Sequence, residues 1–209
     1  MAINYYCIMN IYKFLNKKEQ FGINILNSKG TAILNHKNKF FPVDSVTFLA
    51  EHCISNPEFE CNCILTIGDR QTGKTTGLLR CALKMALSHD NYKIAFVCTN
   101  RISLKNTSDT LYKLIDEFEQ ENNLNITSEI LITKCSFING SAIYFKLPKA
   151  SDFTGSSFNC LIIDDAELLQ DENDEFWYST CCTLSEKRVI LAAMDTKYSR
   201  ENSIVKHFI

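Results

Sequence analysis

Residues 63–80 read CILTIGDRQTGKTTGLLR. The stretch joins an apolar run, a loop bracketed by Gly68 and Gly73, and a second apolar pattern with helical spacing. It contains the pattern G-x-x-x-x-G-K-T, which is typical of a phosphate-binding loop when a strand precedes it and a helix follows. The simpler alternative is a glycine turn beside a surface lysine, but the full pattern rarely arises by chance. The stretch therefore predicts nucleotide binding within an α/β domain.

Each residue type in the loop has a physical role. Gly68 and Gly73 permit backbone angles that let N–H groups converge on phosphate oxygens. Lys74 would supply a cation to the β- and γ-phosphates, and Thr75 a hydroxyl to magnesium. The helix beginning near Lys74 would direct its positive end at the same anion. The implied cofactors are ATP and Mg²⁺, and the candidate binding residues are Gly68, Asp69, Arg70, Gln71, Thr72, Gly73, Lys74, Thr75 and Thr76.

A second motif, downstream of the loop, ends an apolar run in carboxylates. Cys160-Leu-Ile-Ile163 reads as a buried strand that leads into Asp164 and Asp165. Open α/β sheets bind ligands at the carboxyl ends of their strands. We therefore expect Asp164 to join Thr75 as a magnesium ligand and Asp165 to polarise the attacking water. Glu167 is the second candidate for the base, although its spacing from Asp165 directs it elsewhere in a strand or an opening helix.

Size and composition limit the class of protein. The 209 residues suffice for one α/β domain. We divide them into an N-terminal extension with a pre-loop helix (1–55) and an ATPase domain (56–209). The net charge of −2 provides no general basic field, so any DNA contact must come from a local patch or from a ring of subunits. The sequence has no run of 18 apolar residues and no secretory signal pattern, so we expect no membrane contact and an intracellular, reducing location.

The ten cysteines lack the C-x-x-C spacing of a zinc site, and buried thiols are the better interpretation. His36, His52, His89 and His207 have no evident carboxylate or cysteine partners, and we assign them no chemistry. Apolar periodicity predicts the following elements: helices near 3–15 and 43–54, from about 74, over 104–118 and 168–184, and beyond 201; strands at 64–67, 93–98, 130–133, 160–163 and 188–193; and hairpins within 21–41, with its turn at 27–30, and within 136–145, with a primed turn at Asn139-Gly140.

The residues around the phosphate loop resemble those of a known protein family. Arg70-Gln71 ahead of Gly73-Lys74-Thr75 resembles the loop of viral DNA-packaging terminase large subunits, from tailed phages and herpesviruses. Similar segments follow in the family's order over about residues 60–209: Phe153–Phe158, the acidic motif Leu161–Glu167, the coupling strand Ile190–Thr196 and the helix Ser203–Phe208. The resemblance implies a RecA/ASCE-like P-loop NTPase fold with a mostly parallel sheet flanked by helices and a β-hairpin insertion.

The resemblance also implies an activity and partners. The activity would be Mg-dependent ATP hydrolysis that translocates double-stranded viral DNA, in the cytoplasm or nucleus of a host cell. The partners would be DNA, other copies of the chain in a ring, a portal, a small terminase subunit or a separate nuclease subunit. The candidate catalytic residues are Lys74, Asp165, Glu167 and Arg70, with Arg70 expected to reach the γ-phosphate or else to cap the loop.

Several positions depart from the family pattern. The family has Asp-Glu where this chain has Asp164-Asp165, so hydrolysis is expected to be slow. Thr154 stands where an arginine is common, and no later carboxylate cluster predicts a nuclease. Two alternatives stay open: a weakly active or non-catalytic nucleotide-binding scaffold, and a fragment of a superfamily-2 helicase. Arg101 is a candidate for contact with DNA or a neighbouring nucleotide, and Phe40 and Phe41 are candidates for base stacking or core packing.

Overall fold

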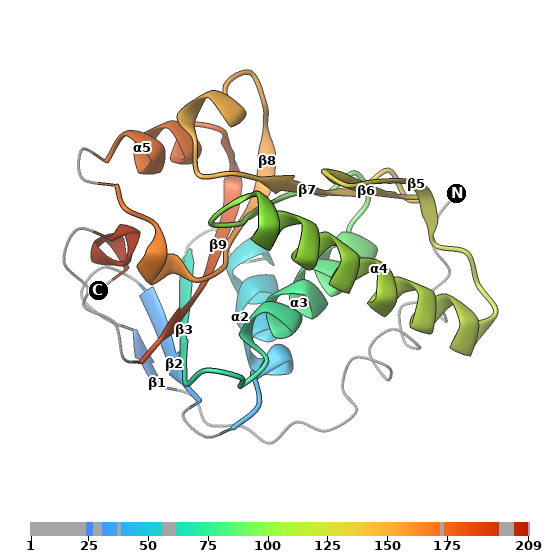
Figure 1. The fold of residues 1–209 in the computed structure, drawn as a ribbon, viewed down its shortest axis with the longest axis horizontal. Helices are drawn as coiled ribbons and strands as arrows, with labels where there is room; N and C mark the ends of the chain where they lie inside the picture. The colour runs from blue at the N-terminus through green and yellow to red at the C-terminus, as the bar shows by residue number, and fades with distance from the viewer. Residues whose placement is uncertain are drawn as a thin grey trace.

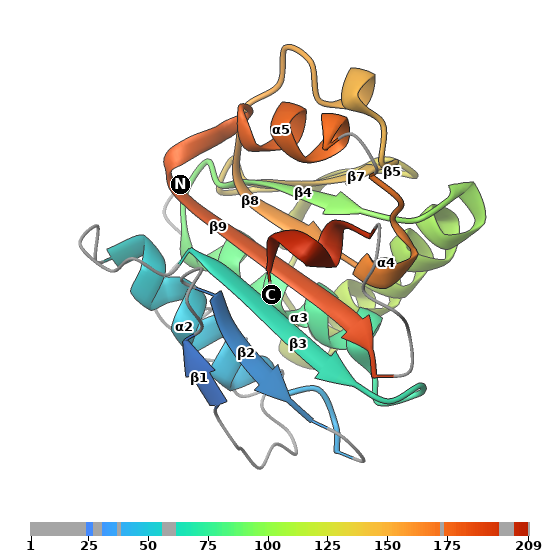
Figure 2. The ribbon, with the colours of Figure 1, turned by 90° about the vertical axis from the view of Figure 1, so that its left-hand side faces the viewer.

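The computed structural model describes residues 24–26, 31–36, 39–55, 62–171, 174–196 and 203–208. In these ranges one central sheet has helices on both faces (Figures 1 and 2). Its strands are β1 (Asn24–Leu26), β2 (Thr31–Asn35), β3 (Cys63–Gly68), β4 (Lys93–Val97), β5 (Thr127–Leu131), β6 (Lys134–Phe137), β7 (Ala142–Lys146), β8 (Phe158–Ile163) and β9 (Leu184–Asp195). The helices are α2 (Val43–Ser55), α3 (Lys74–Ser88), α4 (Arg101–Asn122) and α5 (Glu175–Cys181), with the short 3₁₀ helices η1 (Ala150–Asp152), η2 (Ala166–Leu168) and η3 (Ile204–His207).

The sheet is parallel at its centre and antiparallel at its edges. Its order is β1-β2-β3-β9-β8-β4-β7-β6-β5. Every pair from β2 to β7 is parallel, whereas β1, β6 and β5 pair antiparallel. This arrangement confirms the predicted mostly parallel sheet with a hairpin insertion. Because β9 lies between β3 and β8, the ends of the strands that carry the phosphate loop and the acidic motif face each other across its last residues.

Alternate strand residues enter two separate cores, as expected for parallel strands covered on both faces. Ile64 of β3 packs in the core under α2, α3 and α4. Its neighbour Leu65 packs in the second core with residues of η2, α5 and η3. Figure 2 shows η3 lying over β9 on this second face. All six residues of β3 are buried, which explains why β3 reads as a continuous apolar run rather than an alternating one.

Three predicted elements differ in the structure. The strand expected at 130–133 is β5, which ends at Leu131 before a turn into β6. The Asn139-Gly140 turn is not primed, because only Gly140 has a positive φ (82°), and Gly140 N donates to Phe137 O as in a type I turn. The long helix expected over 168–184 is only α5, because Asp174 has a φ of 56° and the Asp171 carboxylate accepts the N–H groups of Phe176 and Trp177.

Other predictions fall partly outside the described ranges. The helix predicted near 3–15 and the turn predicted at 27–30 lie outside the described residues. The two strands on either side of that turn, β1 and β2, pair antiparallel as the predicted hairpin requires. Cys98, Cys135 and Cys160 are buried thiols, as predicted, and burial raises the pKa of Cys98 to about 12. No helix among the described residues has the length and apolar content needed to span a membrane.

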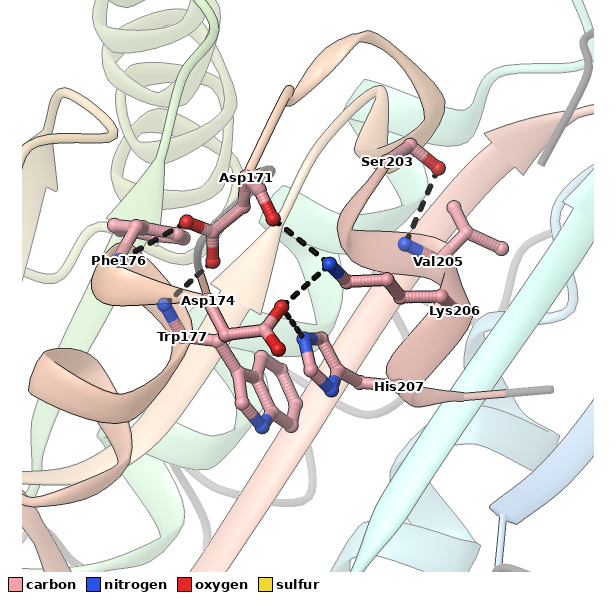
Figure 3. A network of polar contacts seen from close by, with 8 residues as sticks. All are labelled: Asp171, Asp174, Phe176, Trp177, Ser203, Val205, Lys206 and His207. Atoms are coloured by element: carbon pink, nitrogen blue, oxygen red, sulfur yellow. Dashed lines mark hydrogen bonds and ion pairs between the residues drawn. The ribbon is translucent and has the colours of Figure 1, made fainter. Parts of the chain in front are cut away.

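A network of polar contacts fastens the C-terminal segment to α5 (Figure 3). Lys206 Nζ donates to the Asp171 carbonyl at 2.9 Å and pairs with the Asp174 carboxylate. His207 Nε2 lies 3.1 Å from the same carboxylate, and its ring stacks on Trp177 with centroids 4.5 Å apart. The expectation that the histidines lack carboxylate partners was therefore wrong for His207, and also for His89, whose Nε2 lies 2.8 Å from Glu51.

Candidate phosphate-binding site

The loop between β3 and α3 holds its shape through its own contacts. Gln71 (φ 64°) and Gly73 (φ 79°) are in the left-handed region, which Gly73 adopts without a steric penalty. Thr72 Oγ1 donates to the Asp69 carbonyl at 2.8 Å and so closes the loop. No side chain caps α3 at Gly73. The first N–H groups of α3 are therefore directed at the position where a phosphate would lie.

Gly68 is a glycine for a different reason from the one predicted. It does not have a positive φ. A Cβ placed on it would lie 2.1 Å from Cε1 of His36, which packs against it. Close packing, rather than a special backbone angle, therefore excludes a side chain at this position.

Lys74 is buried and folded back on its own loop. Its Nζ donates to the Gly68 carbonyl at 3.1 Å and to the Asp69 carbonyl at 3.0 Å. Both acceptors are neutral carbonyls, which bind an ammonium less strongly than phosphate oxygens do. The lysine is thus held where an incoming triphosphate would draw it away from the carbonyls.

Thr75 and Asp164 connect the loop to the acidic motif. Thr75 Oγ1 donates to Asp164 Oδ2 at 2.7 Å, while Asp164 Oδ1 is buried and has no hydrogen-bond partner. Burial and the nearby Asp165 carboxylate raise the pKa of Asp164 to about 7. A hydroxyl, a carboxylate and an open buried oxygen are the hard donors that magnesium prefers. The residues present therefore fit a Mg²⁺ ion at this point.

The chain turns sharply after Asp164, and the turn places Glu167 in the site. Asp165 has a φ of 47° and precedes η2. Glu167 is 5% exposed, and its Oε2 is buried without a hydrogen-bond partner. Burial raises the pKa of Glu167 and of Asp165, and the charges of Lys74 and Arg70 oppose the rise at Asp165. The expectation that Glu167 points elsewhere was wrong, because the left-handed turn was not foreseen.

Most of these groups line one cavity of about 560 Å³, whereas Asp164 does not line it and is joined to it through the bond from Thr75. Its lining residues are Arg70, Gln71, Gly73, Lys74, Thr75, Asp165, Glu167, Leu168 and Asp195. A second cavity of about 430 Å³, along the start of α4, shares Thr75, Asp165 and Leu168 with it.

The remaining candidates lie near this cavity or behind it. Gly68, Asp69 and Thr72 shape the loop from behind, and Thr76 is half-buried in the first turn of α3. Arg101 is exposed and lines neither cavity.

The two aromatic candidates, Phe40 and Phe41, differ in their exposure to solvent. Phe41 is buried, and a Cβ on Gly77 would lie 2.2 Å from its ring, so Phe41 is a core residue. Phe40 is 74% exposed and stays a candidate for base stacking.

Two residues at the end of β9 were missed in the sequence. Asp195 pairs with Gly68 in the sheet register and lines the cavity. Thr196 Oγ1 donates to Asp69 Oδ1 at 2.6 Å and so ties the end of β9 to the phosphate loop. Their only sequence signal was a position at the end of the coupling strand, where the parallel sheet brings them to the same edge as the loop.

Elsewhere, Asp171, Asp174 and His207 offer ligand atoms within 4.8 Å of one another. The Lys206 ammonium already bonds the Asp171 carbonyl and the Asp174 carboxylate, and it supplies the positive charge that this cluster requires. We therefore assign no ion to it.

Comparison with known proteins identifies a family that matches this chain. A family model described as "Terminase large subunit, T4likevirus-type, N-terminal" matches residues 66–203. No curated protein matches the sequence at a significant level.

Among solved structures, the large terminase of bacteriophage HK97 is similar over 99% of this chain and 40% of its own, with 12% identity and a TM-score of 0.60. The large terminase ATPase domain of Thermus phage P74-26 is similar over 62% of this chain and 58% of its own, with 11% identity and a TM-score of 0.49. At such low identity the HK97 likeness supports the fold alone, and this chain spans less than half of the HK97 protein. Because the family model covers well over half of the chain, the chain belongs to the T4-like family of terminase large subunits, matched over the N-terminal part of that family.

Proposed function

We propose that this chain is a packaging ATPase that hydrolyses Mg-ATP and uses the energy to move double-stranded viral DNA. Family membership supports the packaging role. The observation that carries the ATPase assignment is the bond from Thr75 Oγ1 to Asp164 Oδ2, at 2.7 Å. It joins the phosphate loop to the acidic strand and leaves the buried Asp164 Oδ1 open for a cation.

Each side chain has a distinct part in this proposal. Lys74 exchanges its two carbonyl partners for β- and γ-phosphate oxygens, and the amides at the start of α3 bind the same phosphates. Thr75 and Asp164 would hold magnesium, which would neutralise charge on the phosphates. Glu167 or Asp165 orients the attacking water. Arg70 lines the cavity beside them and stabilises charge on the γ-phosphate.

The partners of the active assembly are part of the proposal as well. The packaging role implies duplex DNA, further copies of this chain in a ring, and a portal, with a small terminase subunit or a separate nuclease subunit as further components. The net charge of −2 offers no general attraction for DNA, so the DNA contact is expected from a local patch or from several copies in a ring.

The test is steady-state phosphate release at saturating Mg-ATP, with and without duplex DNA. We expect slow basal turnover that duplex DNA accelerates. Lys74→Ala and Asp164→Ala should each reduce it by about 100-fold or more, because each removes a charge that stabilises the transition state. Lys113→Ala is the matched control, since Lys113 is an exposed lysine on α4.

The alternatives give different results. Nucleotide binding without turnover above the Lys74→Ala background would favour the scaffold. Acceleration by single-stranded rather than duplex DNA would favour the helicase fragment. If Lys74→Ala and wild type bind ATP equally well, the phosphate-loop assignment itself is wrong.

A further inference from the structure

His36 lies against the first glycine of the phosphate loop. Its backbone N–H donates to the Ile67 carbonyl at 2.9 Å and continues the parallel pairing of β2 with β3, so residue 36 lies beside Gly68. A Cβ on Gly68 would lie 2.1 Å from Cε1 and 2.4 Å from Nε2 of the imidazole. Neighbouring atoms do not approach a real Cβ so closely. The imidazole therefore occupies the space that any side chain at residue 68 would need.

The backbone of Gly68 does not itself demand glycine. Its φ is not in the left-handed region, unlike that of Gly73. An alanine could adopt this backbone conformation if the space beside it were empty. The requirement for glycine at residue 68 is thus a requirement imposed by the His36 ring.

The ring is itself held in place from several sides. His36 is 3% exposed, and its ring meets that of Phe41 edge to face at 5.5 Å. The N–H of Phe41 donates to the Thr72 carbonyl at 3.0 Å. The short segment around His36 and Phe41 consequently contacts the phosphate loop at both ends, at residues 68 and 72.

The contact reaches the catalytic lysine through one peptide group. The carbonyl of Gly68 accepts a hydrogen bond from Lys74 Nζ, so a shift of residue 68 moves one of the lysine's two anchors. The charged groups that face His36 are Lys74 and Asp69. Burial and the Lys74 charge lower the pKa of His36, so the ring is neutral near pH 7 and does not repel the ammonium. Its Nε2 is buried and has no hydrogen-bond partner, so a hydrogen bond from Nε2 does not explain why the ring is buried.

We propose that His36 is a positioning residue for ATP binding: its ring fills the space at residue 68 and fixes the peptide that holds Lys74. The proposal rests on the proposed nucleotide binding. It assigns a role in that binding to a residue that precedes the family match, which begins at residue 66.

The test is a double-mutant cycle between residues 36 and 68. The proteins are wild type, Gly68→Ala, His36→Ala and the variant carrying both changes, with His52→Ala on the surface of α2 as the matched histidine control. The readouts are the affinity for ATP with a fluorescent methylanthraniloyl group, KM and kcat for ATP, and thermal unfolding by circular dichroism.

Gly68→Ala should weaken nucleotide binding by about 10-fold or more, since a misplacement of the order of 1 Å suffices for such a loss. His36→Ala should weaken it several-fold, through KM rather than kcat, and His52→Ala should leave it unchanged. Adding His36→Ala to Gly68→Ala should return the affinity to that of His36→Ala alone, because the clash is gone. If Gly68→Ala does not fold, recovery of both folding and binding in the double variant supports the same contact.

If His36→Ala binds ATP with the same affinity as wild type, the positioning role is wrong. It is also wrong if the double variant binds ATP no more tightly than Gly68→Ala. If wild type itself binds no nucleotide, the proposed function fails, and the positioning role fails with it. The first two outcomes leave the proposed function intact, so the failures are distinguishable.

Discussion

Glu167 and Asp165 both line the phosphate cavity, but their carboxylates are held differently. Glu167 is 5% exposed, and its Oε2 is buried without a hydrogen-bond partner, although the residue lines the cavity. Asp165 is half-buried, and the charges of Lys74 and Arg70 oppose the rise in its pKa that burial causes. A general base must be positioned within hydrogen-bond reach of the attacking water. Glu167 meets this condition better, so we expect Glu167→Gln to lower turnover about 100-fold and Asp165→Asn to have the smaller effect.

Single-turnover phosphate release on both variants, with ATP affinity measured in parallel, decides between them. Glutamine and asparagine preserve shape, so a loss of turnover at unchanged affinity identifies the base. If Asp165→Asn loses turnover while Glu167→Gln retains it, the base is Asp165 instead.

At this scale the sequence predicted the loop well and its surroundings poorly. The pattern around Lys74 and Thr75 is contiguous, so the residues proposed to bind phosphate could be read in one stretch. Asp195 and His36 reach the same site only through strand neighbours, β9 and β2, that are distant in the sequence. Glu167 was misplaced because a left-handed turn at an aspartate has no pattern that periodicity detects.

At the scale of elements, His89 at the end of α3 joins α2 through Glu51. The two side chains meet at 2.8 Å and are each about a quarter exposed. The hydrogen bond to Glu51 raises the pKa of His89 against the opposing effect of burial. A pKa raised in the folded state means that folding favours the protonated imidazole. The stabilisation is therefore complete below the unfolded value, about 6.5, and is lost as pH rises through the raised folded value.

We accordingly expect His89→Gln to lower the melting temperature at pH 5.5 and to differ less from wild type at pH 8.5. A partly exposed pair contributes at most about 1 kcal/mol, or roughly 2–4 °C in a chain of this size. The measurement is the difference in melting temperature between variant and wild type across that range, with His52→Gln as the control histidine on α2. A difference that grows toward pH 8.5 would contradict the assigned direction.

Elements buried on both faces were predictable, and those set by single turns were not. β3, β4 and β8 are continuous apolar runs, so their existence follows from composition alone. The shortening of the helix predicted over 168–184 depends on Asp171, whose carboxylate caps the first turn of α5 from outside the helix. A helical spacing of apolar residues cannot reveal such a stop, because the capping side chain does not interrupt the pattern.

At the scale of the whole molecule, the order of the strands in the sheet is what assembles the site. The motif order along the chain predicted a parallel α/β sheet, but not that β9, the last strand, lies between β3 and β8. That crossover brings Asp195 and Thr196 between the loop and the acidic motif. The segment after β9 returns to the same region, where Ile204 N donates to the Leu169 carbonyl at 3.0 Å, just after Glu167.

Two kinds of contact hold this returning segment, and their magnitudes are unequal. Ile204, Val205 and Phe208 are fully buried, and each such side chain contributes about 1.5–3 kcal/mol by burial. The Asp174–Lys206 pair is about one-third exposed, so solvent screens it and it contributes little to stability. The apolar contacts should therefore hold the segment, and the polar network of Figure 3 should fix only its orientation.

Phe208→Ala should consequently destabilise the protein by about 3–5 kcal/mol. Asp174→Asn should lower the melting temperature far less, because its ion pair is screened by solvent. Trp177, the only tryptophan in the chain, reports both changes, because its ring meets Phe208 edge to face at 5.5 Å and stacks on His207. We expect acrylamide to quench Trp177 more strongly in Phe208→Ala than in Asp174→Asn. Glu175→Gln, an exposed acid in the first turn of α5, should match wild type. A greater loss of stability in Asp174→Asn than in Phe208→Ala would mean that the ionic network, rather than the buried surface, holds the returning segment against α5.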